Sequence, residues 1–452
     1  MRTYQNLLAL GNDEQRRMDF CAAVIAEHTS TDKYKFAQEA QKYYYGENPT
    51  INRYEKILYD LQGKAQADMY TANHKIASSF FGFAVDQKVS YLLGNGVTFG
   101  KDDTADKLGK DFDGVMQELA TNAKIDGVSF GVWNYDRLVA LSYREFAPLY
   151  DENNGALMAG VRWWQVAPGM PLRVELYEID GVTGYIRRPT EKMQIYMPKR
   201  KYVQIRRESQ VDGVSYYDGW NYPGFPVIPL RNNRDEKSEL VGKRNTIDAL
   251  DINTSQMVNN TSEGALIYWI LNNYGGMDEL DDVKFLDRLR TTHIAHLNDD
   301  ESTIEPHTIE APVEGNKVTN DELKSRLYED FRVFDYQSVI SGNQTATAIM
   351  ASYTPLDLDV DKFEAQVTSF VLALLRLLGV DDRPSYTRNR IINRLEETQT
   401  LLMGAQYYDD EYITKKLLTI NGDADQLAAL MERKTVEDSE RIEVEDESGD
   451  IA

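Results

Sequence analysis

The sequence contains a single cysteine, Cys21, so no intramolecular disulfide can form, which fits a reducing compartment. Its N-terminus lacks the apolar block of a signal peptide. The most apolar run, residues 370–380, is too short to span a membrane and contains Arg376. We therefore expect a soluble, intracellular protein without a membrane partner.

Catalytic and cofactor motifs are also missing. The glycines of residues 94–103 have the wrong spacing for a phosphate-binding loop or a dinucleotide site, and a helix end with a turn fits them better. His293 and His296 lie three apart in a strand-like segment, which puts them on opposite faces, and no Cys or carboxylate cluster completes a zinc set. No nucleophile-elbow serine occurs. We expect no enzyme activity, no metal and no cofactor.

The charge balance is strongly acidic. The net charge is −23 and the sequence pI is about 4.7, the opposite of what generic nucleic-acid binders carry. Hydrophobic residues make up 42% and aromatic residues 11% of the 452 residues, enough for a sizeable core. This length predicts two or three domains, or one elongated subunit of several parts.

The N-terminal half predicts helices followed by a β-rich region. Periodicity indicates helices over residues 12–45, stopped by Gly46 and Pro49, and over residues 73–93. Short strands separated by turn residues predict an antiparallel meander over residues 127–231, with residues 211–219 as one of its turns. Trp163 and Trp164 in this region fit packing better than stacking on nucleic-acid bases.

The C-terminal half predicts mostly helices. An unusually polar helix covers residues 238–262, and a strand-rich insert follows. A second helix starts at Thr319, which forms a capping box with Glu322. A long apolar stripe predicts a helix over residues 356–378, ended by Gly379. Short helices then lead to an acidic tail, which we expect to be disordered.

One stretch stands out because it carries no charge. Residues 336–356 lack any charged side chain and are rich in small and neutral polar residues, although the whole chain is 27% charged. By composition alone this stretch reads as an exposed linker. Its position between two amphipathic helices suggests a more specific role.

The order of these modules resembles the portal protein, or head–tail connector, of tailed double-stranded-DNA bacteriophages of the siphophage type. The resemblance covers residues 35–435 and is carried by four stretches. These are YYYGEN at 43–48, the helix with its Tyr-Leu-x-Gly end at 73–99, FPVIPLRNN with the polar helix behind it at 225–260, and the neutral stretch with its following helix at 336–378.

The resemblance implies an α+β fold in an elongated, multi-domain subunit that assembles into a ring around a central channel. The implied parts are N-terminal helices with a β-rich wing (1–238), stem helix 1 (239–263), a β-rich clip (264–318), stem helix 2 (319–341), a tunnel loop (342–354), the long wing helix (355–387), a helical crown (388–435) and the acidic tail (436–452).

By the same resemblance, certain residues take roles in the channel. The tunnel loop would face DNA with Gly342, Asn343, Gln344, Thr345 and Thr347, and Ile349 and Met350 would anchor it by packing back against the wing. Leu323, Leu327, Phe331 and Phe334 would pack the stem. Tyr268, Trp269, Asn272 and Asn273 would lie in the clip, facing terminase.

The implied function is a channel at a unique capsid vertex, through which double-stranded DNA is packaged and later ejected. The implied partners are further copies of the chain, usually twelve, DNA bound without sequence specificity, the terminase large subunit, head-completion (adaptor) and scaffolding proteins, and the major capsid protein. The location would be the virion vertex, and the host cytoplasm during assembly. Two other interpretations stay open: another phage head or neck protein, and a carbohydrate-active enzyme built on the β-rich region.

Overall fold

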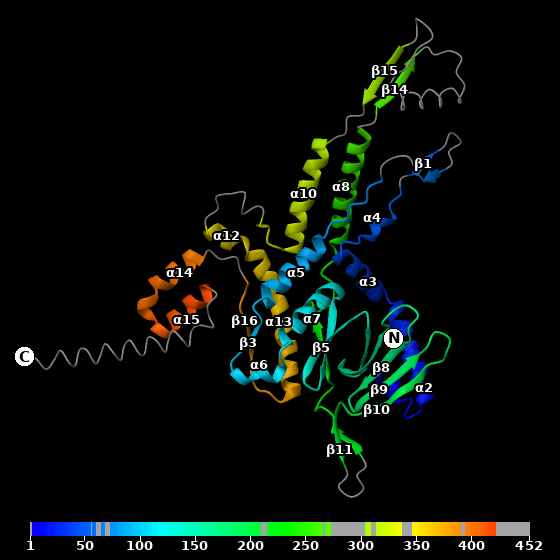
Figure 1. Ribbon diagram of the computed structural model, residues 1–452, viewed down its shortest axis with the longest axis vertical. Helices are drawn as coiled ribbons and strands as arrows, with labels where there is room; N and C mark the ends of the chain where they lie inside the picture. Colours follow the sequence, from blue (N-terminus) through cyan, green and yellow to red (C-terminus); the bar gives the residue numbers. More distant parts are fainter. Residues whose placement is uncertain are drawn as a thin grey trace, which may run out of the picture. The chain divides into compact units, whose positions relative to one another are not determined.

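The computed structural model describes residues 2–55, 57–59, 65–67, 73–208, 215–264, 267–272, 303–308, 313–336, 346–389 and 394–421. The chain divides into two units: residues 1–342 with 352–388, and residues 343–351 with 389–452. All strands in the described ranges belong to the first unit (Figure 1).

The helices of the first unit are α1 (Tyr4–Leu8), α2 (Glu14–Ser30), α3 (Asp32–Tyr44), α4 (Pro49–Arg53), α5 (Phe80–Leu93), α6 (Asp102–Leu108), α7 (Phe112–Asp126), α8 (Arg244–Gly264), α10 (Val313–Phe331) and α13 (Thr354–Leu378). Outside it lie α12 (Ala346–Ser352, whose last residue returns to the first unit), α14 (Arg394–Met403), a 3-10 turn (Ala405–Tyr407) and α15 (Asp410–Asn421).

Within the described ranges, the strands form one five-stranded, one three-stranded and four two-stranded antiparallel sheets. The five-stranded sheet has the order β10 (Gln194–Arg200), β9 (Gly181–Arg187), β8 (Leu172–Glu178), β7 (Leu157–Trp164), β6 (Phe146–Tyr150). The three-stranded sheet has the order β13 (Val227–Arg231), β4 (Val128–Asn134), β5 (Arg137–Ser142). The pairs are β1 (Ile57–Tyr59) with β2 (Ala65–Ala67), β11 (Val203–Glu208) with β12 (Ser215–Trp220), β14 (Ile267–Asn272) with β15 (Thr303–Thr308), and β3 (Val97–Phe99) with β16 (Pro384–Tyr386).

The five-stranded sheet is covered on both faces, as its sequence alternation requires. Ala147 and Leu176 belong to a core shared with α1 and α2, whereas their neighbours Phe146 and Tyr177 belong to a core shared with the three-stranded sheet. Successive side chains on a strand point to opposite faces, so one sequence supplies two cores. The predicted meander is therefore confirmed for β6 to β10, while β4, β5 and β13 form a separate sheet.

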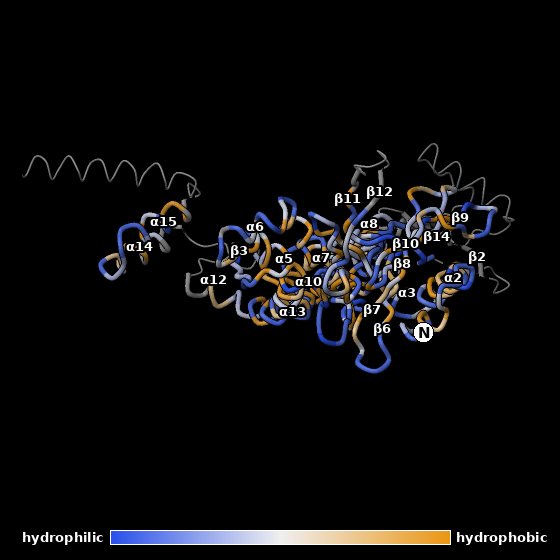
Figure 2. Tube along the Cα trace, turned by 90° about the horizontal axis from the view of Figure 1, so that it is seen from below, coloured by the Kyte–Doolittle hydropathy of each residue, from blue (hydrophilic) through white to orange (hydrophobic). Residues whose placement is uncertain are grey.

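The far side of the three-stranded sheet packs against α7 and α13. Ser129 on β4 donates its hydroxyl to the Leu119 carbonyl of α7 at 2.7 Å. A side chain at Gly131 would lie 2.4 Å from the Phe370 ring of α13, so only glycine allows this close approach. Figure 2 shows hydrophobic stretches around α5, α7 and α13. The predicted long helix is confirmed, and Gly379, at φ +69°, ends it.

Other boundaries differ from the prediction. The expected helix over residues 12–45 is two helices, because Thr31 leaves helical geometry and caps α3 through its hydroxyl, which accepts from the Tyr34 N–H. The expected helix over residues 73–93 begins only at Phe80. Residues 211–219, expected as a turn, contain most of strand β12. Trp163 packs at the edge of the α2 core, as a packing role requires.

The two polar helices also start elsewhere than expected. The first begins at Arg244, because Gly242 has φ +80° and residues 238–243 form turns. The second begins at Val313, so the predicted capping box at Thr319 is wrong. Thr319 lies inside α10, where its hydroxyl donates to the Gly315 carbonyl at 2.9 Å.

The predicted tunnel loop is partly helical. Residues 346–352 form α12, so the expectation of a loop over 342–354 is wrong for this part. The predicted helix at 395–406 is confirmed as α14 up to Met403. The predicted helix at 423–433, the acidic tail and the segment with His293 and His296 lie outside the described residues.

Candidate functional site at the base of the paired helices

The two polar helices lie side by side and are joined by amide hydrogen bonds (Figure 1). The Asn253 side chain on α8 donates to the Asn316 carbonyl at 3.1 Å and to the Asn320 side-chain oxygen at 2.9 Å, both on α10. Hydrogen bonds are directional, so these contacts fix the register of the two helices more narrowly than apolar contacts would.

A second polar surface of α8 binds an extended segment of the chain. Asp251, Ser255 and Asn259 are all buried and lie one helical turn apart. Their oxygens accept hydrogen bonds from the backbone N–H groups of Ser78, Ile76 and His74, at 3.0, 3.0 and 2.7 Å. We call this set the polar ladder.

The polar ladder forms because the repeat distance along α8 matches the repeat distance along the extended segment 74–78. Four residues of helix rise about 6 Å, and two residues of extended chain span roughly 6.6 Å. Every second N–H of residues 74–78 therefore meets every fourth side chain of α8. The polarity of this helix, unusual for a buried element, satisfies backbone donors of a segment that has no sheet partner here.

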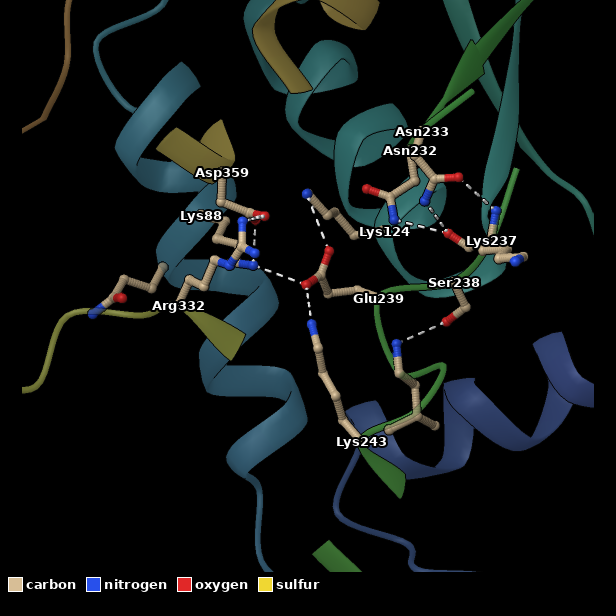
Figure 3. Close-up of polar contacts among 12 residues, drawn as sticks. Lys88, Lys124, Asn232, Asn233, Lys237, Ser238, Glu239, Lys243, Arg332 and Asp359 are labelled. Atoms are coloured by element: carbon tan, nitrogen blue, oxygen red, sulfur yellow. Dashed lines mark hydrogen bonds and ion pairs between the residues drawn. The ribbon is translucent and has the colours of Figure 1, made fainter. Parts of the chain in front are cut away.

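An ion network lies at the base of the helix pair, immediately before α8 (Figure 3). The Glu239 carboxylate binds three ammonium groups: Lys88 of α5 at 2.8 Å, Lys124 of α7 at 3.3 Å and Lys243 at 2.5 Å. Lys88 also binds Asp359 of α13 at 2.6 Å, and Lys88 and Lys124 are both fully buried. The network thus connects α5, α7 and α13 to the start of α8.

The charges in this network depend on one another. Burial alone raises the pKa of Glu239, but Lys124, Lys88 and Lys243 outweigh it and hold this pKa well below the ordinary value. Burial lowers the pKa of Lys124 and of Lys243, and Glu239 opposes that shift. Glu239 is therefore ionised near neutral pH and is the anion on which the buried lysines depend.

The end of α10 is held at the same place. Arg332 has φ +53°, and the N–H groups of Arg332 and Val333 bind the carbonyls of Glu329 and Tyr328, which closes the helix in a Schellman motif. The Arg332 guanidinium lies 3.7 Å from Asp359. The start of α8 and the end of α10 therefore lie at one network.

The chain beyond α10 is clamped directly afterwards. The Gln87 amide on α5 accepts from the Phe334 N–H at 2.7 Å and donates to its carbonyl at 2.9 Å. The Phe334 ring stacks on Tyr353 with centroids 4.1 Å apart, and Tyr353 stacks on Tyr91 at 5.8 Å. Phe334, two residues before the neutral stretch, and Tyr353, near its C-terminal end, are thus fixed against each other.

The structure places the predicted site residues as follows. Leu327, Phe331 and Phe334 are buried and Leu323 is half-buried, although Phe334 lies beyond the end of α10. Tyr268, Trp269 and Asn272 lie on β14, and Thr347 lies in α12. Ile349 is half-buried and Met350 is 63% exposed, and their role as anchors of the loop stays a prediction. Gly342, Asn343, Gln344, Thr345 and Asn273 lie outside the described residues.

The ion network was not predicted from the sequence. Lys88, Lys124 and Glu239 are far apart in the chain, and each looks like an ordinary surface charge. The polarity of residues 238–262 is visible in the sequence, but its cause, the polar ladder, is not. The one available signal was a charged residue within an apolar helical face, as at Lys88 between Val85 and Leu92.

Within the described ranges, no three His, Cys, Asp or Glu side chains gather as a metal site would require. No helix in this part of the chain is long and apolar enough to cross a membrane.

Comparison with known proteins gives the same family that the module order resembles. A sequence model of the family described as "Phage portal protein, SPP1 Gp6-like" matches residues 25–450. The portal protein of Bacillus phage SPP1 is 24% identical over 410 residues, covering 80% of this chain and 76% of that protein. The portal protein of Clostridium phage phiCD119 is 24% identical over 397 residues, covering 79% and 84%.

Solved structures give weaker similarities. A chain in the neck of an empty GTA particle has a TM-score of 0.44 at 10% identity, covering 75% of this chain and 89% of that one. A HK97 family phage portal protein from Corynebacterium diphtheriae has a TM-score of 0.32 at 10% identity, covering 68% and 89%. The family assignment therefore rests on the sequence match, which covers nearly the whole chain: the protein belongs to the SPP1 Gp6-like family of phage portal proteins, which form the portal channel.

Proposed function

We propose that this chain assembles into a closed ring, twelve copies being the number the family resemblance implies, with the α8–α10 pairs side by side around a DNA channel. The observation that carries the proposal is the shared base of the pair. α8 begins and α10 ends beside the Glu239–Asp359 network, so every copy presents them at one angle. A ring needs that uniformity, because its head-to-tail interface closes only at one rotation per subunit.

The charges of the pair suit a channel through which DNA slides. α8 carries three acids and one arginine, and α10 carries five acids and three basic residues. Each helix is thus net negative and offers phosphates no continuous basic track. Tight binding to DNA requires neutralising several phosphates at once, which would stop movement.

The remaining parts take the roles that the family resemblance implies. The segment 264–318, which contains the antiparallel pair of β14 and β15, is proposed to face the terminase large subunit and later the head-completion proteins. The part of the neutral stretch that lies between Phe334 and Tyr353 is proposed to touch DNA weakly, because the stacking of these two rings fixes the chain on either side of it. The C-terminal helices are proposed as a crown inside the head, and the ring would sit at the capsid vertex with the major capsid and scaffolding proteins around it.

Electron microscopy of the purified protein, combined with light scattering, tests the ring. We expect ring-shaped particles with a central hole. A protein that stays monomeric at all salt concentrations would contradict the proposal.

A deletion tests the role of the neutral stretch. Removing residues 342–351 should leave rings intact, because both clamped ends remain. DNA packaging in an infection complementation assay should fall. Normal packaging by this variant would show that the stretch has no role in the channel.

A further inference from the structure

An apolar loop protrudes from the five-stranded sheet between β7 and β8. This apolar loop, residues 165–171, lies in a run without charge from Trp163 to Leu172, in a chain that is 27% charged. Val166 is 81% exposed and Met170 is 54% exposed. Exposed apolar side chains that gather on one element mark a contact surface more often than isolated ones do.

The apolar loop is also preformed. Pro168 and Gly169 occupy the centre of a turn closed by the Met170 N–H, which donates to the Ala167 carbonyl at 3.0 Å. Gly169 has φ +82°, as a type II turn requires at this position. The Gln165 side chain donates to the Met170 carbonyl at 2.6 Å and closes the base. A preformed loop loses little conformational entropy on binding.

An aromatic groove lies elsewhere in the same unit, at the C-terminal end of α13. This groove has a volume of about 470 Å³, and Trp133, Tyr135, Trp220, Tyr222 and Leu378 are among the residues that line it. Its one cation, Lys107, is already paired with Asp103 at 2.7 Å. The groove therefore suits an uncharged, apolar occupant.

The rim of the groove is held in a costly conformation. Tyr135 has φ +61°, a region that bulky side chains rarely adopt. Its N–H donates to the Tyr222 hydroxyl at 3.0 Å, which keeps the Tyr135 ring at the rim, 65% exposed. Trp220, at 54% exposed, lies on β12 and also lines the groove. Strain of this kind persists where the surroundings impose it, and it often accompanies a binding site.

We propose that the apolar loop of one copy inserts into the aromatic groove of the next copy, and that this contact is part of the ring interface. In the single chain Val166 and Met170 are exposed while the groove is open, so the loop does not fill its own groove. The chemistries match, because proline and apolar side chains in a rigid turn pack well on aromatic rings. Two different surfaces that bind each other form a head-to-tail contact, the kind that closes into a ring.

The inference rests on the proposed ring, and cross-linking separates the two. The variant Met170→Cys/Lys107→Cys puts one thiol on the loop and one at the groove without removing an aromatic ring. Burial raises the pKa of the Cys21 thiol to about 12 and shields it, so the native cysteine stays unreactive. A bismaleimide should convert rings of the double variant into a ladder of covalent oligomers, whereas each single variant should give none.

Assembly measurements give a second, independent readout. Val166→Asp and Trp220→Ala should each raise the concentration needed for ring formation at least about tenfold, which corresponds to roughly 1.4 kcal/mol per interface. Their melting temperatures should stay near that of the wild type, because both side chains are exposed. Ile195→Asp, an exposed apolar residue on β10, is the control and should change neither quantity.

The outcomes are distinct. The inference would be overturned, and the ring would stand, if the wild type forms rings but the double variant gives no covalent oligomers and neither Val166→Asp nor Trp220→Ala affects assembly. If Val166→Asp and Trp220→Ala form normal rings and fail only to enter capsids, the groove binds another protein, and the inference is also overturned. A wild-type protein without rings would refute the proposed function itself.

Discussion

Replacing Glu239 by Gln should destabilise the protein more than any exposed ion pair can. The change keeps the shape of the side chain and removes the charge that three ammonium groups share. Lys88 keeps Asp359 at 2.6 Å, and Lys243 is partly exposed and can turn to water. Lys124 is affected most, because it is fully buried and loses Glu239, the carboxylate that binds it.

The magnitude follows from the fate of Lys124. Breaking a buried ion pair by removing one partner costs about 3–5 kcal/mol, because the other charge stays buried without compensation. At roughly 2–4 °C per kcal/mol for a domain of this size, the first unfolding transition should fall by about 10 °C. Differential scanning calorimetry measures this directly.

Two further variants, one a control and one a rescue, test the role of the Glu239 network. Glu191→Gln breaks the exposed pair with Arg188 and should cost less than about 0.5 kcal/mol. Lys124→Met removes the unpaired cation, whose ammonium lies 4.2 Å from the centre of the Phe363 ring, so an apolar side chain fits there. The double variant Glu239→Gln/Lys124→Met should therefore recover much of the loss. If Glu239→Gln unfolds like Glu191→Gln, the network does not carry the stability assigned to it.

Three other predictions concern the surroundings of this site. Ser255→Ala leaves the Ile76 N–H without its acceptor and should cost about 1–3 kcal/mol with faster hydrogen exchange at Ile76, whereas Ser262→Ala on the exposed side of the same helix should do neither. Gly127→Ala places a methyl group 2.2 Å from the Glu236 carbonyl at φ +91°, so its loss in thermal stability should exceed that of Gly155→Ala, which meets no neighbour within 4 Å. Because the pKa of Glu239 is held below its ordinary value of 4.5, its contribution is complete above that pH and is lost as the pH falls below it. The acid side of the stability–pH curve should therefore be shallower for Glu239→Gln than for the wild type.

Periodic elements could be predicted from the sequence, and their ends could not. The apolar stripe of α13 and its Gly379 cap were sufficient, because burial and capping act locally. α10 ends at Phe331, because the next residue, Arg332, is a non-glycine residue in the left-handed region, which no local rule anticipates. Thr319 satisfied the capping pattern, but the helix had already begun at Val313.

The site depended on contacts that sequence spacing does not record. Glu239 and Asp359 are far apart in the chain, and Lys88 joins them only once α5 and α13 are packed. The same holds for Gln87, whose amide binds the backbone of a residue 247 positions away. The order of the modules pointed to the family, because this order can be recognised from sequence patterns without knowledge of individual tertiary contacts.

The base of the helix pair is joined by buried polar contacts as well as by apolar packing, such as that of Phe331 on Phe80 and Phe81, and the polar contacts have a physical consequence of their own. Apolar burial is not directional and tolerates small changes in the angle between elements. The ladder, the Asn253 bonds and the Glu239 network each require oxygen and nitrogen atoms at set distances. Any change in the angle of α8 would separate buried charges and donors from their partners, at a cost of several kcal/mol. Polar joints therefore hold α8 and α10 at a single angle to α5 and α13, the uniformity that identical subunits need in order to close around a channel.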